Sequence, residues 1–296
     1  MSGKADETAL AQVRSNGTNA ISVPPAQSAS PQKEDKRYPV SNTGTLGKAL
    51  SVLDVIASSR TPMRFTDVLH KLDQPRGTLH RQIQNLVEEG LIEIGLDQSY
   101  SLGPRLLKLA ASAWSKNTFR VIAEPHIEQL HDATGETVHL GVLNRVEVIY
   151  LDKIESRQTV RMHSQVGNAS PAYCTGIGKA MLAVLPAGEF AQRVREIEFQ
   201  RHTENTIVDA ASLLAEMEAI RVDGVSHDRE ENEPGIRCVA APISDNSHRI
   251  IAGVSVTAPS YRLNTKDIER WTHLVRKTAD NILADMEDLM GPRNRD

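Results

Sequence analysis

The first regular pattern along the chain is an apolar stripe between residues 45 and 57. Apolar residues recur there at helical spacing, which predicts a helix with one buried face. Residues 60–62 (Arg-Thr-Pro) interrupt this pattern, and Thr66 then begins a second apolar stretch. Because threonine is a good N-cap, we expect a second helix to start at Thr66. The stripe of the first helix consists of Leu46, Ala49, Leu50, Leu53 and Ile56.

A third helix and a β-hairpin follow. Pro75 fits the first turn of a helix, where its missing N–H would have no intrahelical acceptor, and Gly90 ends the helical pattern. Residues 91–94 and 100–102 are short apolar runs around a polar turn, which predicts the hairpin. Three helices followed by a hairpin are the order of a winged helix-turn-helix, which we place at residues 43–103. The apolar side of the third helix consists of Leu79, Ile83, Leu86 and Val87.

Strands and helices interleave through the rest of the chain. Residues 104–117 predict a connecting helix, and residues 118–290 a second domain with a largely antiparallel sheet, so the fold class is α+β. Strands are predicted at 137–142, 147–153, 159–164, 238–243 and 250–257. Helices are predicted at 119–133, 178–185, 210–222 and 265–289.

The segment 1–42 differs in composition from everything after it. It is rich in Ser, Asn, Gln, Pro and Ala and holds the mixed-charge run Lys33-Glu34-Asp35-Lys36-Arg37. Such a segment buries too little apolar surface to offset its ordering entropy, so we expect a disordered tail. It can serve as a spacer or as an arm that contacts DNA.

Charge is distributed unevenly along the chain. The formal net charge of -4 divides into +1 for residues 1–42, +2 for residues 43–116 and -7 for the remainder. A slightly basic module is therefore joined to an acidic body, which alone would not predict DNA binding. With 2 cysteines the chain has no disulfide scaffold, and no apolar run is long enough for a membrane span. We expect a cytoplasmic protein without a membrane partner or a cofactor.

The third predicted helix carries the features of a recognition helix. No acidic residue occurs from Gln74 to Val87, which suits a surface that lies against phosphates. Arginine can bind guanine bidentately and glutamine can bind adenine, whereas an ordinary polar helix face is the alternative interpretation. Arg81 is the strongest single candidate for a DNA contact. The predicted DNA-binding residues are Arg76, Gly77, Thr78, His80, Arg81 and Gln84.

At this point the sequence resembles the IclR family of bacterial transcriptional regulators. In the first domain the resemblance rests on T-L-G-K-A-L-S-V-L-D from residue 45, on Q-P-R-G-T-L-H-R-Q-I-Q-N-L-V-E-E-G-L-I from residue 74, and on Y-S-L-G-P-R-L-L-K-L-A from residue 100. In the second it rests on G-I-G-K-A-M-L-A at 176–183 and E-E-N-E-P-G-I-R-C-V-A-A-P-I at 230–243.

The resemblance implies a winged helix-turn-helix joined by a helical linker to an effector-binding domain with a curved antiparallel sheet flanked by helices. It implies homodimers or homotetramers on palindromic operators of double-stranded DNA. The sequence departs from the common family pattern at Tyr173, Cys174 and Ile177. The effector-binding residues that the resemblance implies are Gly176, Ile177, Asp228, Ile236, Cys238, Ser255 and Thr257.

The chemistry of these positions favours an organic acid as effector. The run from Thr175 to Lys179 is not a phosphate-binding P-loop, because Tyr173 and Ala180 stand where that motif needs Gly and Ser or Thr. A turn that leads into a helix N-terminus can instead bind a carboxylate or a related carbonyl compound. Ser255 and Thr257 share one face of a strand and can converge on the same ligand. Alternatively, Gly176 and Gly178 serve only tight packing.

Other functions were weighed against regulation. Cys238, Asp228 and His227 could form a cysteine hydrolase, but the sequence shows no activating base or oxyanion donors. His126 and His131 are poorly spaced for one metal ion, and His139 and His163 are further possible ligands. The runner-up is a metabolite-binding protein or enzyme that keeps the winged helix as an interaction module, and a third possibility is a protein–protein adaptor. We expect a regulator rather than an enzyme, and specifically a repressor of a catabolic operon.

Overall fold

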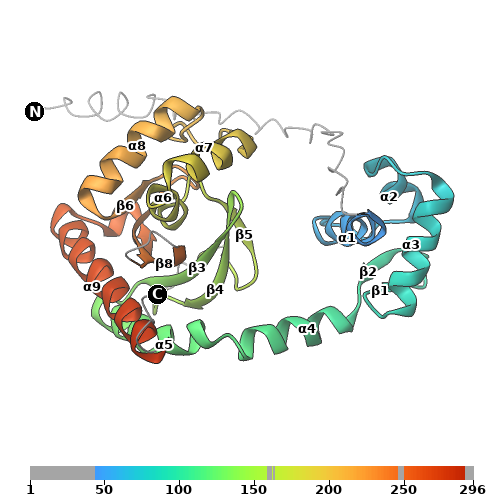
Figure 1. Ribbon diagram of the computed structural model, residues 1–296, viewed down its shortest axis with the longest axis horizontal. Helices are drawn as coiled ribbons and strands as arrows, with labels where there is room; N and C mark the ends of the chain where they lie inside the picture. Colours follow the sequence, from blue (N-terminus) through green and yellow to red (C-terminus); the bar gives the residue numbers. More distant parts are fainter. Residues whose placement is uncertain (1–43, 159–161, 163, 246–249, 291–296) are drawn as a thin grey trace, which may run out of the picture. The chain divides into compact units, whose positions relative to one another are not determined.

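The computed structural model describes residues 44–158, 162, 164–245 and 250–290. The tail predicted at 1–42 lies outside the described residues. Most of the strand predicted at 159–164 does too, and Met162 and Ser164 belong to no strand. The chain divides into two compact units, one up to Leu106 and one from Leu107 onward (Figure 1). Each unit is described separately below.

The first unit contains three helices and a hairpin. The helices are α1 (Gly44–Ala57), α2 (Phe65–Lys71) and α3 (Arg76–Glu88), and the strands are β1 (Ile92–Ile94) and β2 (Tyr100–Leu102). The predicted interior of α3 is confirmed, because Leu79, Ile83 and Leu86 are buried. These side chains pack with α1 and α2 in one core cluster.

Two local predictions in this unit were wrong. The N-cap of the second helix is Arg64, two residues before the expected Thr66, and the Asp67 carboxylate accepts the backbone N–H of Arg64 (2.8 Å). The stripe predicted for α1 is confirmed at Leu53 and Ile56, which are buried, and is wrong in the first half of the helix. Val52 and Val55 are fully buried, whereas Leu46 and Leu50 are 70% and 47% exposed. Two apolar side chains of the expected stripe therefore lie on the surface of this unit.

The hairpin is fastened to the helices by backbone contacts. Its strands are antiparallel, with Ile92 opposite Leu102. The Tyr100 N–H donates to Met63 O (2.7 Å), in the segment between α1 and α2. In the turn, Asp97 accepts both the N–H and the hydroxyl of Ser99 (3.2 and 2.6 Å). The predicted wing is thus a short hairpin with an ordered turn.

The second unit is built on a curled, six-stranded antiparallel sheet. The strand order is β5-β4-β3-β8-β7-β6. This sheet confirms the predicted α+β class and the implied curved sheet. The strands β5 and β6 were not predicted. The strand bounds are β3 (Thr137–Asn144), β4 (Glu147–Ile154), β5 (Ala169–Pro171), β6 (Ser226–Arg229), β7 (Ile236–Ser244) and β8 (Ile250–Pro259).

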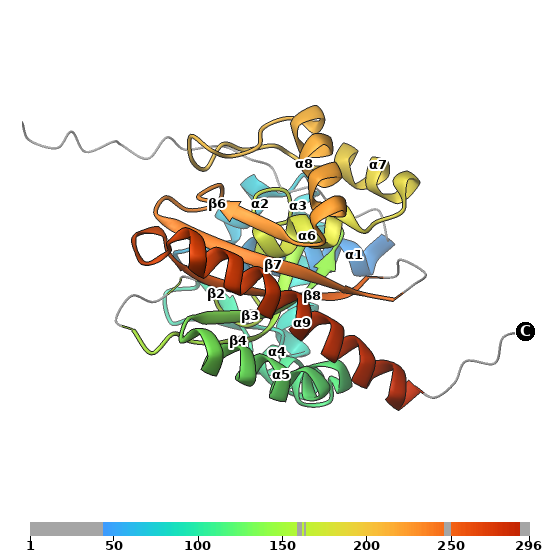
Figure 2. The ribbon, with the colours of Figure 1, turned by 90° about the vertical axis from the view of Figure 1, so that its left-hand side faces the viewer.

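Helices cover both faces of this sheet (Figures 1 and 2). Helix α6 (Gly176–Ala183) lies within the curve of the sheet and contacts β3, β4, β6, β7 and β8. Helices α7 (Ala187–Glu196) and α8 (Ala210–Asp223) lie on the same side as α6, and α7 was not predicted. Helices α5 (Thr118–Thr134) and α9 (Thr265–Met290) pack on the outer face. A short 3-10 turn, Ser260–Arg262, connects β8 to α9.

The alternation of β7 separates two cores. Cys238 and Ala240 face the cluster around α6, whereas Val239 and Ala241 face the cluster around α5 and α9. Successive side chains of a strand point to opposite faces, so one strand can serve both cores. The polar positions that face α6 are therefore set by strand register.

Helix α4 (Pro104–Ser115) follows the hairpin. All twelve of its residues are described, and none of them is buried within this chain. Among the helices of the described segments, none has the length and apolar character that a membrane span requires.

Candidate functional site

The predicted DNA-binding residues lie together on the surface of α3. Arg76, Gly77, His80, Arg81 and Gln84 are exposed, and Thr78 is half-buried. The opposite side of the helix packs into the core of the first unit. The helix therefore presents basic and amide side chains on its free face, which is what binding to phosphates and base edges requires.

Phe65 of α2 positions two of these side chains. The guanidinium of Arg76 lies over the Phe65 ring, 5.2 Å from its centroid. The His80 ring meets the same phenyl ring edge-on, at 5.9 Å between centroids. The sequence analysis did not single out Phe65. A signal was available, since Arg76 and His80 are four residues apart and so share one side of a helix.

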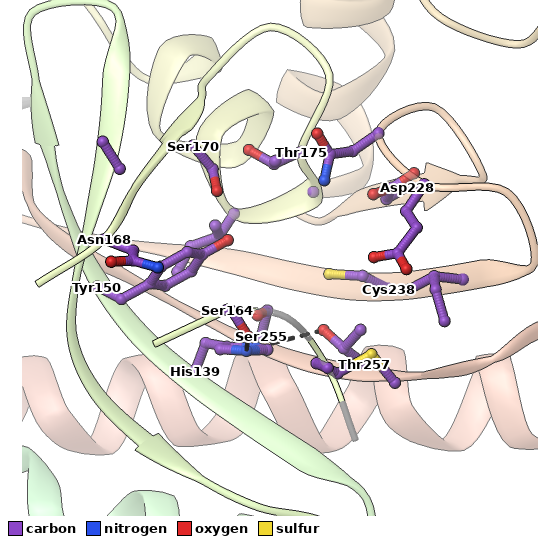
Figure 3. A pocket seen from close by; sticks show the side chains of 17 residues that line it. His139, Tyr150, Ser164, Asn168, Ser170, Thr175, Asp228, Cys238, Ser255 and Thr257 are labelled. Carbon is purple, nitrogen blue, oxygen red and sulfur yellow. Dashed lines mark hydrogen bonds between the residues drawn. The ribbon is translucent and has the colours of Figure 1, made fainter. Parts of the chain in front are cut away.

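A cavity of about 240 Å³ lies between α6 and the sheet of the second unit (Figure 3). All seven residues expected to bind the effector line it. The described lining residues do not include Tyr173 or Cys174, two of the three departures from the family pattern. Ten further residues line the cavity and were not among the predicted effector residues: His139, Tyr150, Met162, Ser164, Asn168, Ala169, Ser170, Thr175, Asn232 and Glu233.

Strand register brings the polar lining residues together. Asp228 of β6 lies opposite Cys238 of β7, and Cys238 lies opposite Thr257 of β8. A second row joins Ser255 of β8 to His139 of β3. Because directly opposite residues point to the same face, each row projects toward α6. This geometry places side chains that are far apart in sequence around one space.

Helix α6 begins at the edge of this cavity. Thr175 donates its hydroxyl to Pro171 O (2.9 Å) rather than capping the helix. A Cβ on Gly176 would lie 2.7 Å from Cys238 Sγ, and one on Gly178 would collide with the backbone of Ala172. Both glycines are therefore needed for packing, and Gly176 also lines the cavity. The first-turn N–H groups of such a helix favour an anionic partner.

The bulk of Ile177 is accommodated by glycines in the sheet. Gly141 and Gly253 are directly opposite each other on β3 and β8. A Cβ on either would lie within 3.3 Å of the Ile177 side chain. Ile177 is 2% exposed, so it acts mainly as the apolar wall between α6 and the sheet.

His139 is a neutral hydrogen-bonding group rather than a cation. Burial, helped by the positive charge of Lys153, lowers the pKa of His139 to about 3. Its Nε2 lies 2.7 Å from Ser164 Oγ, and its Nδ1 lies 3.4 Å from Thr257 Oγ1. These contacts tie β3, β8 and the segment before β5 into one polar wall.

The two cysteines do not have the environment of a nucleophile. Both are free thiols, and burial raises the pKa of Cys174 and of Cys238 to about 12. His227 cannot activate Cys238, because its neighbour Asp228 faces the cavity and His227 points to the other face of the sheet, beside Arg229 and Arg237. Cys238, Asp228 and His227 therefore do not form the arrangement of nucleophile and base that a cysteine hydrolase requires.

The histidines considered as metal ligands make other contacts. His126 Nε2 pairs with Asp285 Oδ2 of α9 (2.7 Å), and His131 Nδ1 contacts Glu136 O (2.9 Å). His163 lies outside the described residues. Within the described part of the chain, no group of three or more His, Cys, Asp or Glu side chains is placed to hold a metal ion.

A buried ion cluster lies behind the cavity and was missed by the sequence analysis. The Lys179 side chain is fully buried, and its Nζ contacts Glu216 Oε1 of α8 (2.8 Å) and Glu231 Oε1 (2.5 Å). It also donates to His227 O (2.8 Å). A buried lysine requires such partners. The cluster joins α6 and α8 to the loop that follows β6.

Each of the two units matches the model of a known protein family. A family model described as "IclR helix-turn-helix domain" matches residues 45–93. A second, "Bacterial transcriptional regulator IclR C-terminal", matches residues 111–284. Together they cover both units of the described chain.

Individual relatives agree with these matches. The chain is 30% identical to the HTH-type transcriptional regulator KdgR of Escherichia coli, over 81% of this chain and 91% of KdgR. It is 32% identical to the regulator BhcR of Paracoccus denitrificans, over 80% and 85% of the two chains. The crystal structure of the Thermotoga maritima IclR is 30% identical, covers 82% of this chain and 98% of its own, and superposes with a TM-score of 0.61. These relatives are transcriptional regulators and not enzymes.

Proposed function

Because this chain belongs to the IclR family of bacterial transcriptional regulators, we propose that it represses a catabolic operon and that a small organic acid controls its affinity for DNA. In this proposal residues 43–103 bind DNA, residues 104–117 form the linker and residues 118–290 bind the effector. The observation that supports this proposal most directly is that all seven expected effector residues line the same cavity. An effector that binds one arrangement of the protein better than another changes DNA affinity by that difference.

The exposed face of α3 supports sequence-specific DNA contacts. Arg81 is exposed and lies on the side of α3 away from the buried Leu79, Ile83 and Leu86. A bidentate contact between an arginine and a base is worth about 1–3 kcal/mol of discrimination. The assigned contacts are those named from the sequence: Arg76, Gly77, Thr78, His80, Arg81 and Gln84.

Exposed apolar side chains support assembly with a second copy of this chain. Leu107 on α4 is 74% exposed, and Leu109 on the same helix is also exposed. Helix α1 exposes Leu46 and Leu50. Apolar surface of this kind is typical of interfaces between subunits, and a two-fold dimer matches a palindromic operator. We therefore assign a homodimer, or a tetramer of two such dimers.

The experiment that tests this function is a gel shift with the DNA upstream of the protein's own gene. The wild-type protein is expected to form a salt-sensitive complex that prefers this DNA over an unrelated fragment. Arg81→Ala is expected to lose about tenfold or more in specific affinity. Arg195→Ala is the matched control, because it removes the same charge from the exposed surface of α7 and leaves the complex intact.

Effector control is tested in the same assay. Pyruvate, lactate and benzoate represent an oxo acid, a hydroxy acid and an aromatic acid. At least one is expected to weaken the complex, and repression is checked by in vitro transcription with and without it. No sequence-preferring binding would contradict the proposed function, and increased transcription on adding protein alone would contradict repression.

A further inference from the structure

One lining residue of the cavity is an acid with an unusual environment. Asp228 lies on β6, the edge strand of the sheet, and is only 7% exposed. Its Oδ1 accepts the backbone N–H of Glu231 (2.7 Å). Figure 3 shows its carboxyl at the side of the cavity where α6 begins. A buried carboxylate without a cation of its own is costly, so its ionisation depends on the charges around it.

Titratable and charged groups surround Asp228 on several neighbouring elements. Helix α6 contributes Lys179, which contacts Glu216 of α8. The Nζ of Lys179 contacts both Glu216 and Glu231, and Arg229 Nη1 also contacts Glu216 (3.2 Å), so both cations already have carboxylate partners. The remaining titratable neighbours are Glu231 and Glu233 in the loop after β6, Cys174 before α6, Cys238 on β7, Tyr150 on β4, and His227 and Arg229 on the outer face of β6 itself.

These surroundings favour the neutral acid. Burial raises the pKa of Asp228 to about 7, and the charge of Glu231 acts in the same direction. The backbone N–H groups of Glu231 and Asn232 and the Lys179 ammonium oppose the shift without reversing it. Cys174, Cys238 and Tyr150 do not supply a compensating charge, because burial raises the pKa of each to about 12 and leaves it neutral near pH 7.

The place where a carboxylate ligand would bind is directly beside this acid. The backbone of Gly176, the first residue of α6, packs against Asp228, whose N lies 3.4 Å from where a Cβ on Gly176 would be. Thr175 does not cap the helix, so the first-turn amides can donate to a ligand. A second carboxylate at this point would repel an ionised Asp228. Two carboxyl groups in contact share one proton instead.

We propose that Asp228 takes up one proton from solvent when a carboxylate effector binds in this cavity, and that it donates this proton in a hydrogen bond to the effector. This proposal rests on the proposed function, because it concerns the effector of the same cavity. No bond of the effector breaks: the buffer acid loses a proton, and an oxygen of the Asp228 carboxylate gains it. Effector affinity therefore depends on pH although the effector itself stays ionised.

The sign of the dependence follows from linkage. Below the pKa of free Asp228 the proton is already in place, and affinity is at its maximum. Above this pKa, Asp228 must take up one proton from solvent for each effector molecule that binds. The dissociation constant then rises by about tenfold for each unit of pH. A site that used a fixed cation, or a permanently ionised Asp228, would show no such slope between about pH 6 and about pH 8.5, where simple carboxylic acids remain ionised.

The test is calorimetric titration of the full-length protein with pyruvate, lactate and benzoate. Titrations at about pH 8 in phosphate and in Tris, which differ in ionisation enthalpy, give the number of protons taken up. We expect close to one proton per bound acid for the wild-type protein, and a dissociation constant that rises with pH. This wild-type measurement needs no variant to fold.

Two variants identify the group that takes up the proton. Asp228→Asn keeps a neutral donor in place and is expected to bind the acid with no proton uptake and no pH slope. Glu218→Gln is the matched control, because it neutralises an exposed acid of α8 outside the cavity wall and is expected to retain the proton uptake and the pH slope. Glu233→Gln neutralises the other acid of the described cavity wall and tests it as the alternative proton acceptor. Loss of proton uptake in Glu233→Gln but not in Asp228→Asn would overturn the assignment.

The remaining outcomes are also decisive. A wild-type protein that binds an acid without proton uptake overturns the proton linkage but leaves effector binding in place. If none of the three acids binds, the assignment of this cavity to carboxylates is overturned. The gel shift without effector decides DNA binding independently, so failure of this proposal is distinguishable from failure of the proposed function.

Discussion

At the scale of single residues, Gly176 shows how closely α6 approaches the sheet. A Cβ at this position would lie 2.7 Å from Cys238 Sγ and 3.6 Å from the Cβ of Ala240. Both neighbours belong to a well-packed core that cannot give way without displacing other side chains. The glycine therefore fixes the distance between the start of α6 and β7, and with it the width of the cavity.

We expect Gly176→Ala to lower the free energy of unfolding of the second unit by about 1–3 kcal/mol through overpacking, as measured by urea denaturation. It should also weaken effector binding, because the displaced Cys238 side chain narrows the cavity. Adding Cys238→Ala removes the obstructing sulfur and is expected to restore part of the loss. Gly188→Ala is the control, because a Cβ there meets no atom within 4 Å. Equal losses at both glycines would contradict this account.

At the scale of elements, α2 and α3 are joined at the face that we propose to bind DNA. Phe65, the first residue of α2, contacts Arg76 and His80 of α3 through its ring. These contacts restrict two long or mobile side chains before DNA is bound. Preorganisation of this kind lowers the entropy lost on binding.

Phe65→Leu is expected to reduce specific DNA affinity by about 0.5–1 kcal/mol, the value of a partly exposed cation–π contact. The first unit should stay folded, because leucine still packs against the core that Phe65 touches. Fluorescence anisotropy with operator DNA measures the loss. In combination with Arg76→Ala the two losses should not add, since they remove the same contact. Simple additivity would argue that Phe65 acts on stability alone.

The elements also show where sequence patterns suffice and where they do not. The interior of α3 could be predicted because a periodic apolar stripe determines its buried side. Strand β6 could not, because Ser226, His227, Asp228 and Arg229 are all polar and become a strand only through pairing with β7. In α1 the stripe was misassigned, since Leu46 and Leu50 are apolar without being buried within this chain.

The lining residues of the cavity also fall into those that the sequence predicted and those that it did not. Its seven expected members came from the family resemblance, and all of them line the cavity. His139, Tyr150 and Asn168 were not among the predicted effector residues, because they reach the cavity through the register of β3 and β4 and through the segment before β5. Such neighbours are determined by strand pairing between distant parts of the chain, which periodicity does not record.

At the scale of the whole molecule, the distribution of apolar surface and charge fits the proposed assembly on DNA. Helix α4 exposes leucines along its length, and the chain after residue 116 carries a net charge of -7. An acidic body is repelled by phosphates, so we expect DNA to be contacted through the first unit, with the face of α3 proposed above. Two α3 helices must then act together to give useful affinity. Self-association and DNA binding are therefore expected to be coupled.

Leu107→Gln is expected to raise the dissociation constant of the dimer by about thirtyfold or more, because each of the two copies loses roughly 1–2 kcal/mol of apolar burial. Sedimentation velocity over a concentration series measures this change. Affinity for a full palindrome should fall with it, while affinity for an isolated half-site should not. Val222→Gln is the matched control, since Val222 is an equally exposed apolar residue on α8. An unchanged dimer would contradict the role of α4.

The pairing of β6 with β7 has a consequence for how related proteins could diverge. Asp228 faces the effector cavity, whereas His227 and Arg229 on either side of it line a second hollow, to which Arg237 of β7 also belongs. Deleting or inserting one residue in the connection from Glu230 to Gly235 would shift β6 by one position and turn these faces over. An acid would leave the cavity and basic side chains would enter it. A single change of loop length could thus reverse the charge preference of the sensor in one evolutionary step, with no substitution in the cavity itself.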